Sequence, residues 1–110
     1  MDWNSSIKGF KAYLLLEKSL SAHSIEAYIR DVGKLLEFVL IQKIDLTPDK
    51  LTGEHLTAFI YYINDLGLEP KSQARIISGI RAFYKYLVME DIIDKDPSEL
   101  LESPKLQRTL

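Results

Sequence analysis

The residues of this sequence best suited to chemistry are four cations in the segment 70–89, and that chemistry is the binding of a polyanion. The segment holds four Lys or Arg and no Asp or Glu. Residues 1–69 carry ten acids and seven bases, and residues 90–110 carry six acids and three bases, so the net charge of −2 conceals one basic stretch. Because phosphate groups are met by clustered Lys and Arg, this stretch is a candidate for contact with a nucleic-acid backbone.

On a helical wheel, the segment 70–89 separates into an apolar side and a polar side. The apolar side consists of Ile76, Ile77, Ile80, Phe83, Tyr84 and Leu87. The polar side consists of Lys71, Arg75, Ser78, Ala82 and Lys85. Small residues between cations let a helix backbone approach a polyanion closely. An ordinary solvated helix face would also carry Lys and Arg, so the wheel alone leaves both interpretations open.

Two further residues of this segment, Ser72 and Arg81, have two interpretations each. Ser72 and Gln73 fall in the first turn, where free N–H groups and the helix dipole favour phosphate oxygens, although Ser72 could instead satisfy its own backbone. Arg81 lies at the edge between the two sides and could reach either a phosphate or a carboxylate. We expect a structural pair between Arg81 and Asp31, because an Arg beside a core boundary is usually held by an acid.

The sequence lacks the groupings that common enzyme and metal sites need. Cysteine is absent, which excludes thiolate chemistry and suits a cytoplasmic protein. His23 and His55 stand apart with no third ligand at metal spacing, and there is no Gly-rich phosphate loop. Apolar runs are far shorter than the roughly 20 residues of a membrane span. We therefore expect no catalytic residue, metal, cofactor or membrane partner. The six tyrosines all fall in apolar helical patterns: Tyr13, Tyr28, Tyr61, Tyr62, Tyr84 and Tyr86.

Apolar residues recur at helical spacing along nearly the whole chain, which predicts an all-α fold. We expect one compact bundle of four main helices plus a short C-terminal helix. The expected helices run from about Ser5 to Ser19, Ser21 to Gln42, Gly53 to Leu66, Pro70 to Val88 or Met89, and Ser98 to Leu101. Ser5 or Ser6 would cap the first and Ser21 the second, and Gly67 would end the third in a left-handed conformation.

The same spacing predicts which residues form the core. In the first helix these are Ile7, Phe10 and Leu14, with Tyr13 as a further candidate. In the second they are Ile25, Ile29, Val32, Leu36, Val39 and Leu40, and in the third Leu56, Phe59, Ile60 and Ile63. The opposite, polar side of the second helix would hold Ala27, Arg30, Asp31 and Lys34.

Three segments of the chain carry a resemblance to a known family. "LSAHSIEAYIRDV" (20–32) resembles the Leu-Ser-x-x-Thr-x-x-x-Tyr-x-Arg-Asp-Leu signature of the core-binding, SAM-like domain of Xer-type tyrosine recombinases, in the phage integrase family. "KSQARIISGIRAFYKYL" (71–87) is similar to that family's Ser-x-x-Arg-x-x-Ser-x-x-Arg-x-Phe-Tyr-x-Tyr-Leu helix, and "DPSELLESPKLQRTL" (96–110) looks like its Asp-Pro helix and Pro-Lys linker. Gly79 departs from the pattern, standing where Ala is frequent.

The resemblance implies the N-terminal DNA-binding domain of a site-specific recombinase, which grips duplex DNA as half of a C-shaped clamp during integration or recombination. It implies a domain of residues 1–103, then a linker at 104–110 leading to a catalytic domain that carries the tyrosine nucleophile and is absent from this chain. Partners would be double-stranded DNA, that catalytic domain and other protomers of a tetrameric synapse. The implied DNA-binding residues are Ser24, Tyr28, Arg30, Lys34, Lys71, Ser72, Arg75, Ser78 and Lys85.

Two alternatives remain beside this interpretation. Tyr28 lies at the rim of the apolar stripe, so a packed ring with an outward hydroxyl is as well supported as a DNA contact. The domain as a whole could be a helical protein-interaction module whose basic helix faces an acidic partner. The first helix and the short tail would be the surfaces for contact between protomers.

Overall fold

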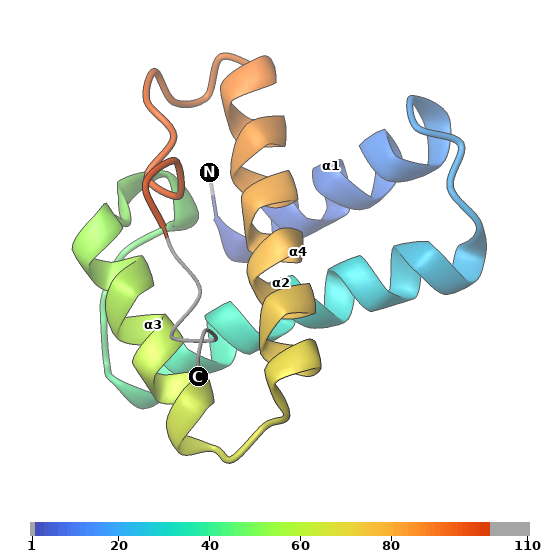
Figure 1. Ribbon diagram of the computed structural model, residues 1–110. Helices are drawn as coiled ribbons and strands as arrows, with labels where there is room; N and C mark the ends of the chain where they lie inside the picture. Colours follow the sequence, from blue (N-terminus) through green and yellow to red (C-terminus); the bar gives the residue numbers. More distant parts are fainter. Residues whose placement is uncertain (1, 102–110) are drawn as a thin grey trace.

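The computed structural model describes residues 2–101 of the chain, and these residues contain helices and no strand. The all-α prediction is confirmed (Figure 1). The helices are α1 (Trp3–Leu16), α2 (Ala22–Ile41), the short 3-10 helix η1 (Pro48–Lys50), α3 (Gly53–Asp65) and α4 (Pro70–Met89). The predicted boundary at residue 103 and the linker 104–110 lie outside the described residues.

Local capping explains where the helices begin and end. The cap of α1 is Asp2, whose carboxylate accepts from the Ser5 N–H at 2.7 Å, so the prediction of Ser5 or Ser6 was wrong. Ser21 caps α2 as predicted, and Gly67 follows α3 with a φ of +81°. The expected helix at residues 98–101 is instead a hydrogen-bonded turn, since the Asp96 carboxylate accepts from both the backbone and the hydroxyl of Ser98.

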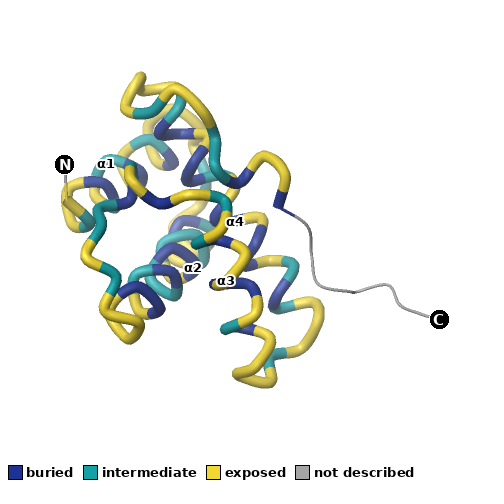
Figure 2. Tube along the Cα trace, turned by 90° about the vertical axis from the view of Figure 1, so that its left-hand side faces the viewer, coloured by how far each residue is buried: buried dark blue, intermediate teal, exposed yellow. Residues whose placement is uncertain are grey.

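The core lies between α4 and the other three helices, and the predicted apolar faces of α3 and α4 are buried in full (Figure 2). The prediction for α2 was partly wrong. Leu40 is 67% exposed, whereas Leu35 and Phe38 are buried. Because α2 packs against α3 as well as α1 and α4, its buried face is turned toward Leu35 and Phe38.

The connection between α2 and α3 is fastened to the other helices by two long-range hydrogen bonds. The indole N–H of Trp3 donates to the Leu46 carbonyl at 3.1 Å. The buried hydroxyl of Tyr84 donates to the Pro48 carbonyl at 2.8 Å, and burial raises the pKa of this hydroxyl. Each bond satisfies a polar group of an aromatic side chain whose ring packs on the core.

The helix α4 crosses over α2 (Figure 1). The two helices approach each other closely at Gly79. A Cβ atom at this position would lie 2.6 Å from Oδ2 and 2.8 Å from Cβ of Asp31. The second atom belongs to the base of the Asp31 side chain, which cannot swing aside without moving α2. The absence of a side chain at Gly79 therefore sets how near the two helices can come.

The carboxylate that meets Gly79 is buried and paired. Asp31 is 2% exposed, although the helical wheel placed it on the polar side of α2. Its Oδ1 accepts a hydrogen bond from Nη1 of Arg75 at 2.7 Å. The predicted pair with Arg81 is therefore wrong. Arg75 lies one turn before Gly79 on the same side of α4, whereas Arg81 points elsewhere and donates to the Leu101 carbonyl.

Burial raises the pKa of Asp31 to about 6, against the opposing effect of Arg75 and, more weakly, Arg30. Since this pKa exceeds the ordinary value of 3.8, the folded chain holds the proton to a higher pH than the unfolded chain. The stability that this proton contributes is present below about pH 4 and is lost as the pH rises to about 6.

Asp31→Asn should therefore change the pH dependence of unfolding. We expect the free energy of unfolding of the wild type, relative to Asp31→Asn, to fall by up to about 3 kcal/mol between pH 4 and pH 7. Urea unfolding of both proteins across this range measures it, and the comparison cancels the titration of the other acids. A difference that stays constant with pH would contradict the assignment.

Gly79→Ala should destabilise the fold by about 1–3 kcal/mol, because the new methyl group forces α4 away from α2. The matched control is Gly33→Ala in α2, where a Cβ would meet nothing within 4 Å. The free energy of unfolding of that control should rise by up to about 1 kcal/mol, because Ala has a better helix propensity than Gly. Urea unfolding followed by the fluorescence of Trp3 measures both changes, and equal effects at the two glycines would contradict the close crossing.

Candidate nucleic-acid interface

Two adjoining hollows lie where α2 and α4 meet, and we call them together the α2–α4 groove. The smaller, of about 200 Å³, is lined by Ser24, Ala27, Tyr28, Asp31, Arg75 and Ser78. The larger, of about 420 Å³, is lined by Tyr13, Leu14, Lys18, Leu20, Tyr28, Ser78, Arg81, Ala82 and Lys85. Tyr28 and Ser78 line both hollows, so the groove is continuous past these two side chains.

Helical spacing places the groove residues in two facing stripes. On α2, Ser24, Tyr28 and Asp31 follow one another at intervals of four and three residues. On α4, Arg75, Ser78, Ala82 and Lys85 repeat the same intervals. Residues three or four apart share one face of a helix, so each stripe forms one wall.

The structure brings together five of the nine predicted DNA-binding residues. The five that line the groove are Ser24, Tyr28, Arg75, Ser78 and Lys85. The four that do not line it are Arg30, Lys34, Lys71 and Ser72. Lys71 and Ser72 lie in the first turn of α4, one turn before Arg75, and Arg30 is exposed on α2.

The sequence patterns did not predict a DNA-binding role for two cations of the groove, Lys18 and Arg81. Lys18 comes from the turn after α1, where Ser19 adopts a φ of +53°. No pattern within one helix could predict its place beside α4, because it belongs to another element. Arg81 lines the larger hollow while its guanidinium also donates to the Leu101 carbonyl.

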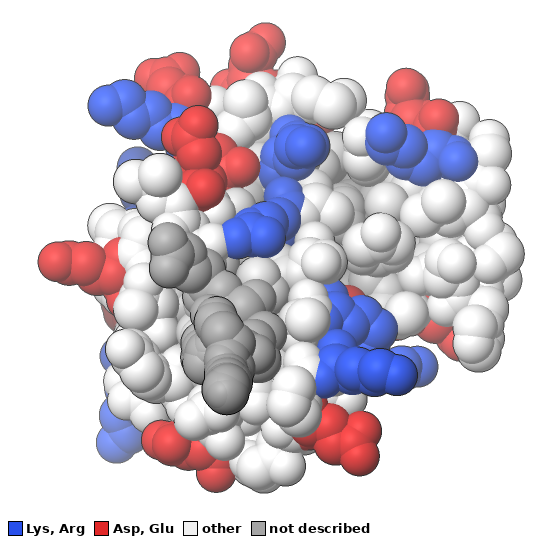
Figure 3. Space-filling model, viewed as in Figure 1, with Lys and Arg blue, Asp and Glu red and all other residues white. Residues whose placement is uncertain are grey.

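The charged side chains that line the groove are mostly positive. Its ionisable carboxylate is Asp31, and that group is buried and paired with Arg75, while Lys18, Arg75, Arg81 and Lys85 supply four cations. Figure 3 shows basic side chains following α4 across one face of the molecule, with acidic ones gathered mainly toward the rim of that view. Such a face attracts a polyanion despite the net charge of the chain.

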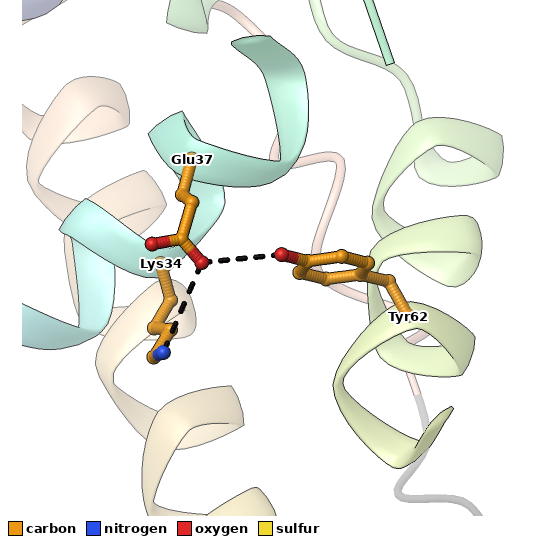
Figure 4. Close-up of polar contacts among 3 residues, drawn as sticks. All are labelled: Lys34, Glu37 and Tyr62. Carbon is orange, nitrogen blue, oxygen red and sulfur yellow. Dashed lines mark hydrogen bonds and ion pairs between the residues drawn. The ribbon is translucent and has the colours of Figure 1, made fainter. Parts of the chain in front are cut away.

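Lys34 lies outside the groove in a separate polar cluster that joins α2 to α3 (Figure 4). Its Nζ lies 3.8 Å from Oε1 of Glu37, and the Tyr62 hydroxyl donates to the same oxygen at 3.1 Å. Desolvation and the neighbouring Glu37 raise the pKa of Tyr62. Glu37 thus offsets part of the charge of Lys34, which makes it a weaker candidate for phosphate contact than the groove cations.

Gln73 does not present its side chain to a ligand at the start of α4. It is buried, and its amide nitrogen donates to the Leu68 carbonyl at 2.8 Å and to Oδ1 of Asn64 at 3.3 Å. The side chain therefore holds the turn between α3 and α4.

Tyr28 packs its ring against the core. The ring meets Phe10 edge-on, with centroids 6.2 Å apart, and the residue is half-buried. The packed ring is thus compatible with a place on the groove wall.

Other kinds of site are not seen among the described residues. Residues 2–101 contain no group of three or more His, Cys, Asp or Glu side chains placed to hold a metal ion. No helix in this part of the chain is long and apolar enough to cross a membrane.

Comparison with known proteins identifies the family. Residues 7–91 match the family "Phage integrase, N-terminal SAM-like domain". The tyrosine recombinase XerD of Chlorobaculum tepidum is 32% identical over 108 residues, which cover 98% of this chain and 35% of that protein. XerD of Staphylococcus saprophyticus is 38% identical over 94% of the chain and 35% of its own length. XerC of Pseudomonas syringae pv. syringae is 38% identical over 89% of the chain and 32% of its own length.

The chain spans about a third of the length of these curated relatives. No solved structure gave a significant match. The family match covers all of α2, α3 and α4, which include both walls of the groove. The chain therefore belongs to the phage integrase N-terminal SAM-like domain family, and its relatives are the Xer tyrosine recombinases.

Proposed function

We propose that this chain binds duplex DNA through the α2–α4 groove, as the N-terminal half of a clamp in a site-specific tyrosine recombinase. The observation that carries the proposal is the charge of the groove: among residues 2–101, four cations line it and the one carboxylate that lines it is already paired. The names of the relatives, tyrosine recombinases XerC and XerD, support DNA as the polyanion.

The groove residues suggest how the contact would be made. Lys18, Arg81 and Lys85 would meet phosphate oxygens, which supply most of the affinity of a protein for DNA and no sequence information. Ser24 and Ser78 would donate hydroxyl hydrogen bonds to the same backbone. Because Ser78 and Ala82 are small, the backbone of α4 can approach the duplex closely.

Residues outside the groove would extend this contact along both helices. Lys71 and Ser72 lie at the start of α4, where the helix dipole favours a phosphate. Arg30 is exposed on α2, and Lys34 remains a candidate despite its neighbour Glu37.

The cleavage of DNA by a tyrosine nucleophile would belong to a catalytic domain outside these residues. We propose that the chain works beside that domain, on the opposite side of the duplex, and beside other protomers of a tetrameric synapse. Exposed apolar residues on α1, Leu15 at 54% and Leu16 at 74%, offer a surface for contact between protomers.

A basic helix facing an acidic protein is the competing function. The same cations would pair with carboxylates, so the shape of the groove does not separate the two ligands. The family relationship favours DNA, and direct binding experiments distinguish the two functions.

Binding of this chain to duplex DNA should depend strongly on salt. If about four cations meet phosphates, log K should fall with log salt concentration at a slope of roughly −3 to −4, because each contact releases condensed counterions. Fluorescence anisotropy of a labelled mixed-sequence duplex of about 30 base pairs, about three helical turns, gives the slope. Affinity that does not change with salt, or no binding at low salt, would overturn the proposal.

Lys85→Glu should weaken this binding by about tenfold and reduce the salt slope by about one. Lys85 is exposed and lines the groove, so its replacement leaves the core intact. The control is Lys50→Glu, which makes the same charge change at an exposed residue of η1, beside the segment 92–97. The control should bind within about twofold of wild type, since a remote exposed charge is screened by salt. Equal losses in the two variants would point to net charge instead of the groove.

A further inference from the structure

The contact between Asp31 and Arg75 joins one buried group to one half-exposed group. The Asp31 side chain is 3% exposed, whereas the Arg75 side chain is 47% exposed and lines the smaller hollow of the groove. In their hydrogen bond, Nη1 of Arg75 donates to Oδ1 of Asp31. A guanidinium has five N–H donors in a rigid planar fork, so holding Nη1 also sets the directions of the donors on Nη2 and Nε.

A DNA phosphate would not displace Asp31 from this pair. Asp31 is 2% exposed, and α4 at Gly79 packs closely against its side chain. Removing Arg75 would strand a buried charge without its partner, which is far more costly than leaving one surface contact unmade. Arg75 must therefore meet any ligand with its remaining donors while Nη1 stays on Asp31.

We propose that Asp31 is a positioning residue for DNA binding: it holds the Arg75 guanidinium so that the free donors face the hollow between Ser24 and Ser78, where a phosphate group binds. This inference rests on the proposed function. The hollow supports it, because both serines line the space beside Arg75 and their hydroxyls can donate to the same phosphate.

A purely structural role for Asp31 leads to the opposite result in a binding experiment. If Asp31 only ties α2 to α4, replacing it with a neutral residue in a folded protein removes a negative charge from a DNA-binding surface. On charge alone, affinity for DNA should then stay the same or rise. If Asp31 positions Arg75, affinity should fall although the protein has become less negative.

The test measures binding of the labelled mixed-sequence duplex of about 30 base pairs at low salt and pH 7.5. Asp31→Asn should bind about tenfold more weakly than wild type. Adding Arg75→Ala to Asp31→Asn should then weaken binding by no more than about threefold, because a neutral Asn amide holds the guanidinium less firmly than the carboxylate does and Arg75 then contributes little. Arg75→Lys keeps the charge and can keep the ion pair but lacks the fork, so it should also lose about tenfold.

Circular dichroism and urea unfolding followed by Trp3 fluorescence show whether each variant is folded. Folded Asp31→Asn that binds as tightly as wild type, or more tightly, would overturn the inference and leave the proposed function standing. If Asp31→Asn does not fold, Arg75→Lys decides, and wild-type affinity in that variant overturns the inference. Failure of the wild type to bind the duplex would overturn the proposed function and this inference with it.

Discussion

The close crossing of α4 over α2 at Gly79 is the constraint on which the rest of the structure depends. It brings the α4 backbone against the side chain of Asp31, and this contact removes the carboxylate from water. A buried carboxylate needs a partner, and Arg75, one turn away on the same side of α4, provides it. The crossing also brings together two polar stripes that are separate in sequence, and so it makes the groove.

A cluster of aromatic side chains packs between the helices that form the groove. Phe10 lies at its centre, with ring centroids 6.2 Å from Tyr28, 5.4 Å from Phe83 and 5.7 Å from Tyr86. These residues belong to α1, α2 and α4, so the helices that carry the groove share one packed cluster. Because packed interiors deform little, the groove walls are held at a fixed separation. Two of the cations, Arg75 and Arg81, are also held by hydrogen bonds to Asp31 and to the Leu101 carbonyl, which lowers the entropy that these two side chains lose on binding.

Sequence periodicity predicted the helices and most of the core because both follow from contacts within one element. The predicted apolar faces of α3 and α4 are buried, and the cap at Ser21 is in place. Periodicity failed for Asp31, which a wheel assigns to the polar side of α2. The burial of that residue depends on the rotation of α2 against α4, and no single helix encodes it. The glycines were only a weak signal: glycine within a helix is costly, but of the two at Gly33 and Gly79 only Gly79 marks a close approach.

The crossing of α2 and α4 also lets a chain with a net charge of −2 present a surface for a polyanion. At physiological salt, exposed charges more than about 8 Å away are largely screened, so a bound phosphate responds mainly to its near neighbours. Among the described residues that line the groove those neighbours include four cations, and the one carboxylate, Asp31, is buried and paired. Acidic residues elsewhere on the surface therefore weaken the long-range attraction between the chain and a polyanion more than they weaken the contact of a bound phosphate with the groove. A sequence average cannot represent this separation, because it arises only when α2 and α4 cross.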